Sequence, residues 1–69
     1  MRVMFHAWLP GRPVIEHVDA NIPIHDRFLM YTKLRDIWHA MHPSIPFFHV
    51  AAFIRKPNRI FKLEKNHNE

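Results

Sequence analysis

Histidine is the residue type in this chain that is most able to do chemistry, and there are seven histidines among 69 residues. Asp36 and His39 lie three residues apart in a predicted helix, and His42 follows three residues later. A carboxylate and an imidazole at this spacing share one face of a helix, as two ligands of one metal ion would. However, a zinc site needs three or four ligands at about 2 Å, and the chain has no cysteine and no HExxH motif. We therefore predict a solvated helix pair at Asp36 and His39, and neither a metal nor a cofactor.

Two histidines near the N-terminus raise the question of a ribonuclease-type reaction, which needs a general base, a general acid and a cation near the phosphate. His6 and His17 are the candidate acid and base, and Arg12 is the candidate cation. In the hairpin predicted below, a three-residue loop sets Phe5 opposite His17, so His6 and His17 point to opposite faces. We therefore expect each histidine to lie at the sheet edge or to donate one hydrogen bond to the core.

Nucleophilic catalysis has few candidate residues in this sequence. Ser44 lies in a Pro-Ser-Ile-Pro segment and Thr32 lies within the predicted helix, and neither has a neighbouring base that would activate it. Gly11 is the only glycine, so there is no glycine-rich loop to hold a phosphate group. We predict that the protein is not an enzyme.

Basic residues near the C-terminus are better candidates for a functional site. The net charge of the chain is +4, and residues 55–69 hold five basic and two acidic side chains, so +3 of it lies there. We predict that these basic residues bind an anionic partner: Arg55, Lys56, Arg59, Lys62 and Lys65. If residues 59–65 form a strand, Arg59 and Lys65 share one face and Lys62 lies on the other. The partner is then RNA, an anionic lipid head group or an acidic protein surface. The alternative is that these charges protect an edge strand from aggregation.

Two hairpins are expected to position these residues. Apolar residues alternate on both sides of a Pro-Gly-Arg turn in residues 2–19, which predicts a β-hairpin with Trp8 opposite Val14. Residues 47–54 predict a buried strand, followed by a turn at residues 56–58 and a returning strand over residues 59–65. Ala51 and Ala52 leave a short helix over residues 47–56 as the alternative.

Residues 24–41 predict an amphipathic helix. Six large side chains follow the spacing of one helical face: Met30, Tyr31, Leu34, Ile37, Trp38 and Met41. Pro23 and Asp26 favour a helix start, and Pro43 ends the helix. Phe28 and Leu29 lie outside this apolar face, so they either sit under a loop or form a second contact face for a partner.

Together these elements predict an α+β fold in one small domain over residues 1–65. The predicted order is β-hairpin, amphipathic α-helix, β-hairpin (ββαββ). Residues 66–69 are expected to fray as a polar tail. The alternative is a mostly helical or extended subunit that becomes ordered only in its assembly.

The amount of apolar surface indicates that the protein works with other proteins. Hydrophobic residues make up 48% of the chain and aromatic residues 13%, while a single core contributes only about 3–5 kcal/mol in chains below about 70–80 residues. We expect other protein subunits to cover four of the side chains: Phe28, Leu29, Phe47 and Phe48. The sequence thus predicts a non-catalytic accessory or structural subunit of a larger multi-subunit assembly, and not a lone monomer. The alternative is a small basic nucleic-acid-binding protein that uses the C-terminal hairpin.

Residues 37–54 contain no Asp, Glu, Lys or Arg, which raises the question of a membrane. Pro43 and Pro46 interrupt any helix there, so contact with a membrane surface fits better than a span, with Arg55 just beyond. No acidic residue precedes Glu16, which is compatible with import into an organelle. We therefore expect an intracellular protein, and favour a membrane-associated complex of the mitochondrion or another organelle, such as a respiratory complex, over the ribosome.

Overall fold

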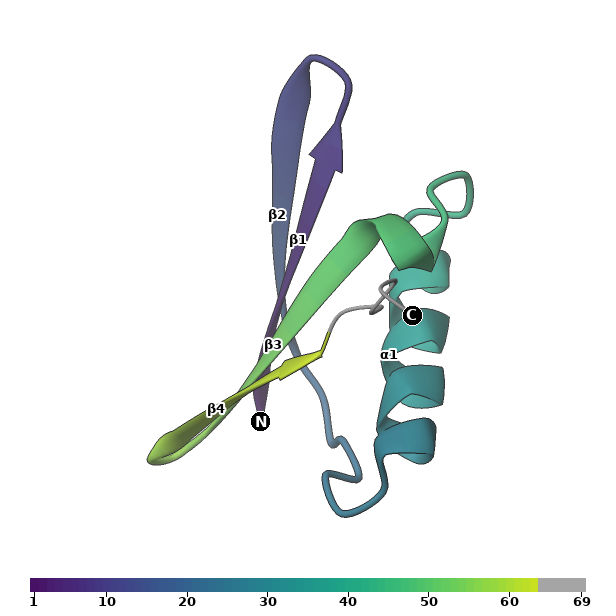
Figure 1. Cartoon of the computed structure of the whole chain (residues 1–69). Coiled ribbons are helices and arrows are strands. Elements are labelled where there is room, and N and C mark those ends of the chain that lie inside the picture. Colours follow the sequence, from purple (N-terminus) through teal and green to yellow (C-terminus); the bar gives the residue numbers. More distant parts are fainter. Residues whose placement is uncertain (64–69) are drawn as a thin grey trace, which may run out of the picture.

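Two β-hairpins with a helix between them form the described part of the chain, residues 1–63 of a computed structural model (Figure 1). The elements in chain order are β1 Arg2–Leu9, β2 Arg12–Asp19, α1 Arg27–Met41, a short 3-10 helix η1 Phe47–His49, β3 Val50–Lys56 and β4 Arg59–Leu63. The predicted α+β fold in the order ββαββ is therefore confirmed, and the mostly helical or extended alternative is wrong. The predicted domain end at residue 65 and the tail 66–69 lie outside the described residues.

The four strands form one antiparallel sheet in the order β2-β1-β3-β4. The two hairpins are joined by pairing of β1 with β3, in which Phe5 lies opposite Ala52 and Val3 opposite Ile54. β1 and β3 are thus the central strands, and β2 and β4 are the edges. Residues 50–55 of the second hairpin thus lie beside β1 of the first hairpin, whereas β4 pairs with β3 alone.

The first turn is one residue shorter than predicted. Leu9 pairs with Arg12, so only Pro10 and Gly11 form the loop, and Gly11 adopts a φ of 94° that favours glycine. The shorter loop shifts the register by one residue, which sets Glu16 rather than His17 opposite Phe5. A shift of one residue turns every side chain of β2 to the other face relative to β1. The predicted pairing of Trp8 with Val14 is likewise wrong, because Trp8 lies opposite Pro13.

The core lies between α1 and one face of the sheet (Figure 1). Its buried residues are Val3, Phe5, Ala7, Ile22, Met30, Leu34, Trp38, Phe47, Val50, Ala52, Ile54 and Leu63. The Trp38 ring lies with its centroid 5.3 Å from that of Phe5, and its Nε1 donates a hydrogen bond of 2.9 Å to the Ile45 carbonyl. Trp38 therefore joins the helix to the central strand and to the connector after the helix.

Helix α1 begins at Arg27, three residues after the predicted start. Asp26 adopts an extended conformation and acts as the N-cap, because its Oδ1 accepts hydrogen bonds from the backbone N–H groups of Phe28 (3.0 Å) and Leu29 (3.1 Å). Pro23 and Ile24 belong to the preceding loop. The predicted apolar face of the helix is confirmed, since Met30 and Leu34 are buried with Trp38.

The capping carboxylate gives a first testable prediction. Asp26→Ala removes the acceptor of two backbone N–H groups, so the free energy of unfolding should fall by about 1 kcal/mol. Urea denaturation followed by far-UV circular dichroism measures this change. Asp36→Ala is the matched control, because Asp36 is an exposed carboxylate within the same helix that caps nothing. An equal loss in both variants would contradict the assigned cap.

The uncharged run at residues 37–54 is divided among the end of α1, the connector, η1 and β3. The predicted strand is confirmed over residues 50–54 and continues to Lys56, which was predicted to lie in the turn, while residues 47–49 form the single turn of η1 instead of strand. Pro46 ends the connector and precedes this turn. Among residues 1–63, no helix is both long and apolar enough to span a membrane.

Candidate functional site

The histidines of the helix do not gather into a metal site. Among residues 1–63, no three His, Cys, Asp or Glu side chains lie close enough together to hold a metal ion. Asp36 is exposed and its carboxylate lies 3.7 Å from the Arg35 guanidinium. His42 instead contacts two residues of the fold: its Nε2 lies 3.0 Å from Glu16 Oε2, and its ring centroid lies 4.3 Å from that of Trp38. This contact connects the end of α1 to the edge strand β2.

The two N-terminal histidines lie on the same face of the sheet, contrary to the prediction. The shorter turn sets Ile15 opposite His6 and Met4 opposite His17, so both imidazoles project from the side away from α1. Arg12 is five residues from His17 along β2, which is about 17 Å. The candidate cation for phosphate chemistry is therefore remote from one of the two histidines, so the three residues considered for a ribonuclease-type reaction do not lie together.

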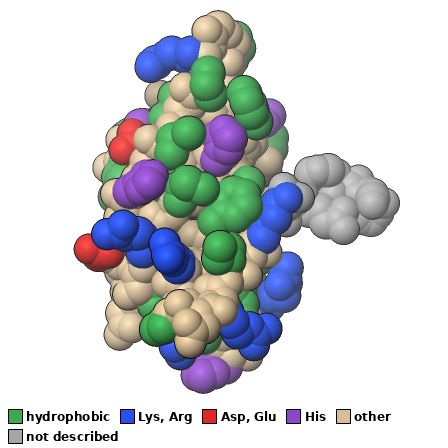
Figure 2. Space-filling model, turned by 90° about the vertical axis from the view of Figure 1, so that its left-hand side faces the viewer, with side chains coloured by type: hydrophobic (Ala, Val, Ile, Leu, Met, Phe, Trp, Pro, Cys, Tyr) green, Lys and Arg blue, Asp and Glu red, His purple; other side chains and the backbone are tan. Residues whose placement is uncertain are grey.

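The face of the sheet away from α1 is the main candidate surface, and we call it the open face. By strand alternation and register, its residues are Arg2, Met4, His6, Trp8, Pro13, Ile15, His17, Asp19, Ala51, Phe53, Arg55, Ile60 and Lys62. Trp8 and Ile60 are each 68% exposed, and Ile15 is 53% exposed. Figure 2 views this side of the molecule and shows hydrophobic side chains along its middle, histidines among them, and Lys and Arg side chains around them.

One end of the open face is basic. Arg2 and Arg55 lie directly opposite each other on the central strands, where like charges destabilise a sheet. Within residues 1–63 neither guanidinium makes a hydrogen bond or an ion pair, although Asp19 lies opposite Arg2 on the other side. A shallow hollow of about 220 Å³ lies at this end, lined by Arg2, Met4, His17, Phe53, Arg55 and Ile60. We call it the Arg2–Arg55 hollow. An anion seated there would offset the repulsion between the two arginines.

The aromatic rings of the open face already have neighbours on that face. The His6 ring lies 4.8 Å from the Trp8 ring, between centroids, at an interplanar angle of 39°. The Lys62 Nζ lies over the Phe53 ring, 5.7 Å from its centroid. Both rings are thus partly covered by polar or charged groups.

The basic residues predicted to act together are divided between the two faces of the second hairpin. Arg55 and Lys62 project from the open face, whereas Lys56 and Arg59 pair with each other on the opposite side. Lys65 lies outside the described residues. Arg2 was missed, because it joins Arg55 only through the pairing of β1 with β3, which no local pattern in the sequence indicates.

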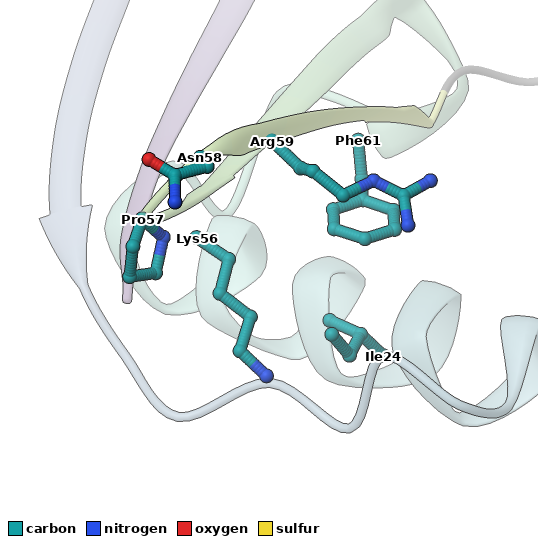
Figure 3. Close-up of a pocket in the computed structure, with 6 residues that line it drawn as sticks. All are labelled: Ile24, Lys56, Pro57, Asn58, Arg59 and Phe61. Atoms are coloured by element: carbon teal, nitrogen blue, oxygen red, sulfur yellow. The ribbon is translucent and has the colours of Figure 1, made fainter.

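Lys56 and Arg59 line a second hollow of about 360 Å³, between the β3–β4 turn and the loop before α1. Its walls are Ile24, Lys56, Pro57, Asn58, Arg59 and Phe61 (Figure 3). The Arg59 guanidinium carbon lies 4.9 Å from the Phe61 ring centroid, so this cation packs on an aromatic ring. The second hollow is therefore separated from the Arg2–Arg55 hollow by the thickness of the sheet.

The four predicted interface residues also divide. Phe28 is 74% exposed, and Leu29 and Phe48 are about half exposed, so these three side chains are accessible to a partner. The alternative that Phe28 and Leu29 lie under a loop is wrong. Phe47 is corrected as well: it is only 5% exposed, and its ring packs against Phe5 and Tyr31 in the core. Its burial follows from η1, which turns the first residue of the expected strand inward.

The open face thus combines exposed apolar side chains with a basic end, and no helix or strand of residues 1–63 packs over it. Sequence reasoning identified Arg55 and Lys62 of this surface, and did not identify Arg2, Trp8 or Ile60 as part of it. No protein-family model, no curated protein and no solved structure matches this chain.

Proposed function

We propose that this protein is a non-catalytic accessory subunit that docks onto another protein of a larger assembly through its open face. The supporting observation is the composition of that face. An antiparallel sheet with one solvated side normally carries polar residues there. This sheet instead presents Trp8, Ile15 and Ile60 to solvent, with Met4 and Phe53 half-buried between them.

The apolar side chains of this domain lie on both sides of the sheet, some in the core under α1 and others on the open face. The core is formed by side chains of this chain, so a partner would cover the open face and is not needed to complete the core. The four strands are eight, eight, seven and five residues long, so the sheet covers about 440 Å² in plane. This is about half of the roughly 800 Å² that each partner buries in a stable interface, and the relief of the side chains adds to it.

Native complexes test this function directly. The tagged full chain, expressed in its source cells and separated by gentle size exclusion, should elute with a species much larger than 8.4 kDa. The variant Trp8→Ser/Ile60→Ser should elute as a folded small protein, because two exposed anchors of the interface are lost. Phe28→Ser/Leu29→Ser is the matched control, since it removes two exposed apolar side chains from the helix and should leave the complex intact.

Elution of the wild-type chain as a folded monomer would contradict the proposed function. If only the Phe28→Ser/Leu29→Ser variant lost the complex, the partner would bind the helix at Phe28 and Leu29 and not the open face. An organellar membrane-associated complex stays a prediction, based on the uncharged residues 37–54 and the lack of acidic residues before Glu16.

The second candidate function is a small nucleic-acid-binding protein. It is favoured by one observation, the presence of Arg2, Arg55 and Lys62 on the same face as Phe53. Cations that contact phosphates beside an aromatic ring are typical of proteins that bind single strands. The division of the hairpin cations between two faces weakens this candidate, because a single strand on the open face reaches only part of them.

A further inference from the structure

We infer that the Arg2–Arg55 hollow binds a carboxylate from an acidic segment of the partner protein. This inference rests on the proposed function and adds the chemistry of the partner. The segment carries a Glu or Asp side chain, which contacts the two arginines of the hollow. Apolar residues flank this side chain and contact the apolar lining.

Charge complementarity is the first step. Arg2 and Arg55 project side by side from the two central strands, and within the described residues neither has an anionic partner. A guanidinium presents planar pairs of N–H donors that fit the two oxygens of a carboxylate. Asp19 is the one acidic residue among the described residues of the open face, and it lies at the edge rather than between the two arginines.

The apolar lining is the second step. Met4, Phe53 and Ile60 form the walls of the hollow beside the two arginines. A free inorganic anion would leave these side chains in water, whereas a peptide segment covers them while its carboxylate reaches the arginines. Burial of this lining also lowers the local dielectric constant, which strengthens the ionic contact.

The same observations disfavour the two other occupants. A second copy in a two-fold contact would bring the same patch against itself, and so place arginines against arginines. Single-stranded nucleic acid needs open ring faces on which bases stack, but Phe53, the phenylalanine ring that lines the hollow, already has the Lys62 Nζ over it. The acidic peptide segment is the occupant that uses both the cations and the aliphatic lining.

Two matched peptides test this inference. The ¹⁵N-labelled full chain is titrated with acetyl-Leu-Glu-Leu-amide and with acetyl-Leu-Gln-Leu-amide, and backbone amide shifts are followed by NMR. The Glu peptide should shift the amides around Arg2, Met4, Phe53 and Arg55, with a Kd about tenfold lower than that of the Gln peptide. Arg55→Gln should raise the Kd for the Glu peptide to the Gln-peptide value. Lys56→Gln is the matched control, because it removes the next cation on the opposite face and should leave the Kd unchanged.

Each other outcome overturns the inference. Equal affinity for both peptides would show an apolar surface that does not select carboxylates, and shifts outside the hollow, or none, would show that it binds no such segment. Tighter binding of a twelve-residue oligothymidylate, lost in Arg55→Gln, would assign the hollow to nucleic acid. These results are distinguishable from failure of the proposed function, because that experiment measures the size of the native complex, whereas the titration measures peptide binding to the isolated chain.

Discussion

Trp38→Ala should leave the protein largely unfolded at 25 °C. The Trp38 side chain is fully buried, contacts Phe5, and donates a hydrogen bond to the Ile45 carbonyl. Truncation of a buried Trp to Ala costs about 3–5 kcal/mol. A domain of this size has a free energy of unfolding of roughly 3–10 kcal/mol. The loss therefore removes most or all of the stability, and far-UV circular dichroism in urea should show either no cooperative transition or one at a much lower midpoint.

Two further variants separate the causes of this loss. Trp38→Phe keeps an aromatic ring in the core but removes the N–H group that binds the Ile45 carbonyl, so its cost should be smaller, about 1–3 kcal/mol. His39→Ala is the neighbouring control, since His39 is exposed on the same helix. A Trp38→Ala variant within 1 kcal/mol of the wild type would show that the helix does not pack on the sheet as described.

The helix and the order of elements could be predicted from the sequence because their signals are local. The spacing of Met30, Leu34 and Trp38 marks one buried helical face whatever lies against it. The helix start was misplaced by three residues, since Asp26 acts as the N-cap from outside the helix. Local spacing thus identified the helix face more accurately than its boundary.

The register and the strand order could not be predicted, because both depend on distant contacts or on one residue of a turn. A loop of two residues instead of three turned β2 over and brought His17 to the same face as His6. The pairing of β1 with β3 joins residues about fifty positions apart, such as Arg2 and Arg55. The part of the open face that β1 contributes, including Arg2, could therefore not be predicted from the sequence. Arg55 and Lys62 were identified from their charge.

Both faces of β1 carry large apolar residues, which is why alternation alone did not reveal the open face. Val3, Phe5 and Ala7 form the buried side, while Met4 and Trp8 lie on the other side. A strand with one wet face ordinarily shows polar residues at every second position. Met4 and Trp8 break this rule, and this is the one sign of the open face that the sequence contains. It indicates an exposed apolar surface only when the helix is known to cover the other face of the sheet.

Phe5→Ala and Trp8→Ala should differ strongly in their effect on stability, although both remove an aromatic ring from the same strand. Phe5 is fully buried and contacts Trp38 and Phe47, so its truncation should cost about 3–5 kcal/mol. Trp8 is 68% exposed and contacts the His6 ring, so its truncation should change the free energy of unfolding by about 0.5 kcal/mol or less. Urea denaturation of the isolated full chain measures both values.

The comparison decides whether the open face is free in the isolated protein. If Trp8→Ala costs as much as Phe5→Ala, the Trp8 ring is buried in solution, and the open face is not available to a partner. If it is near neutral in the isolated chain, Trp8 does not hold the fold together, and loss of the native complex in a Trp8 variant then reports on binding alone. A large exposed ring without a role in stability is what a docking surface requires, since its contribution appears only when the partner removes it from water.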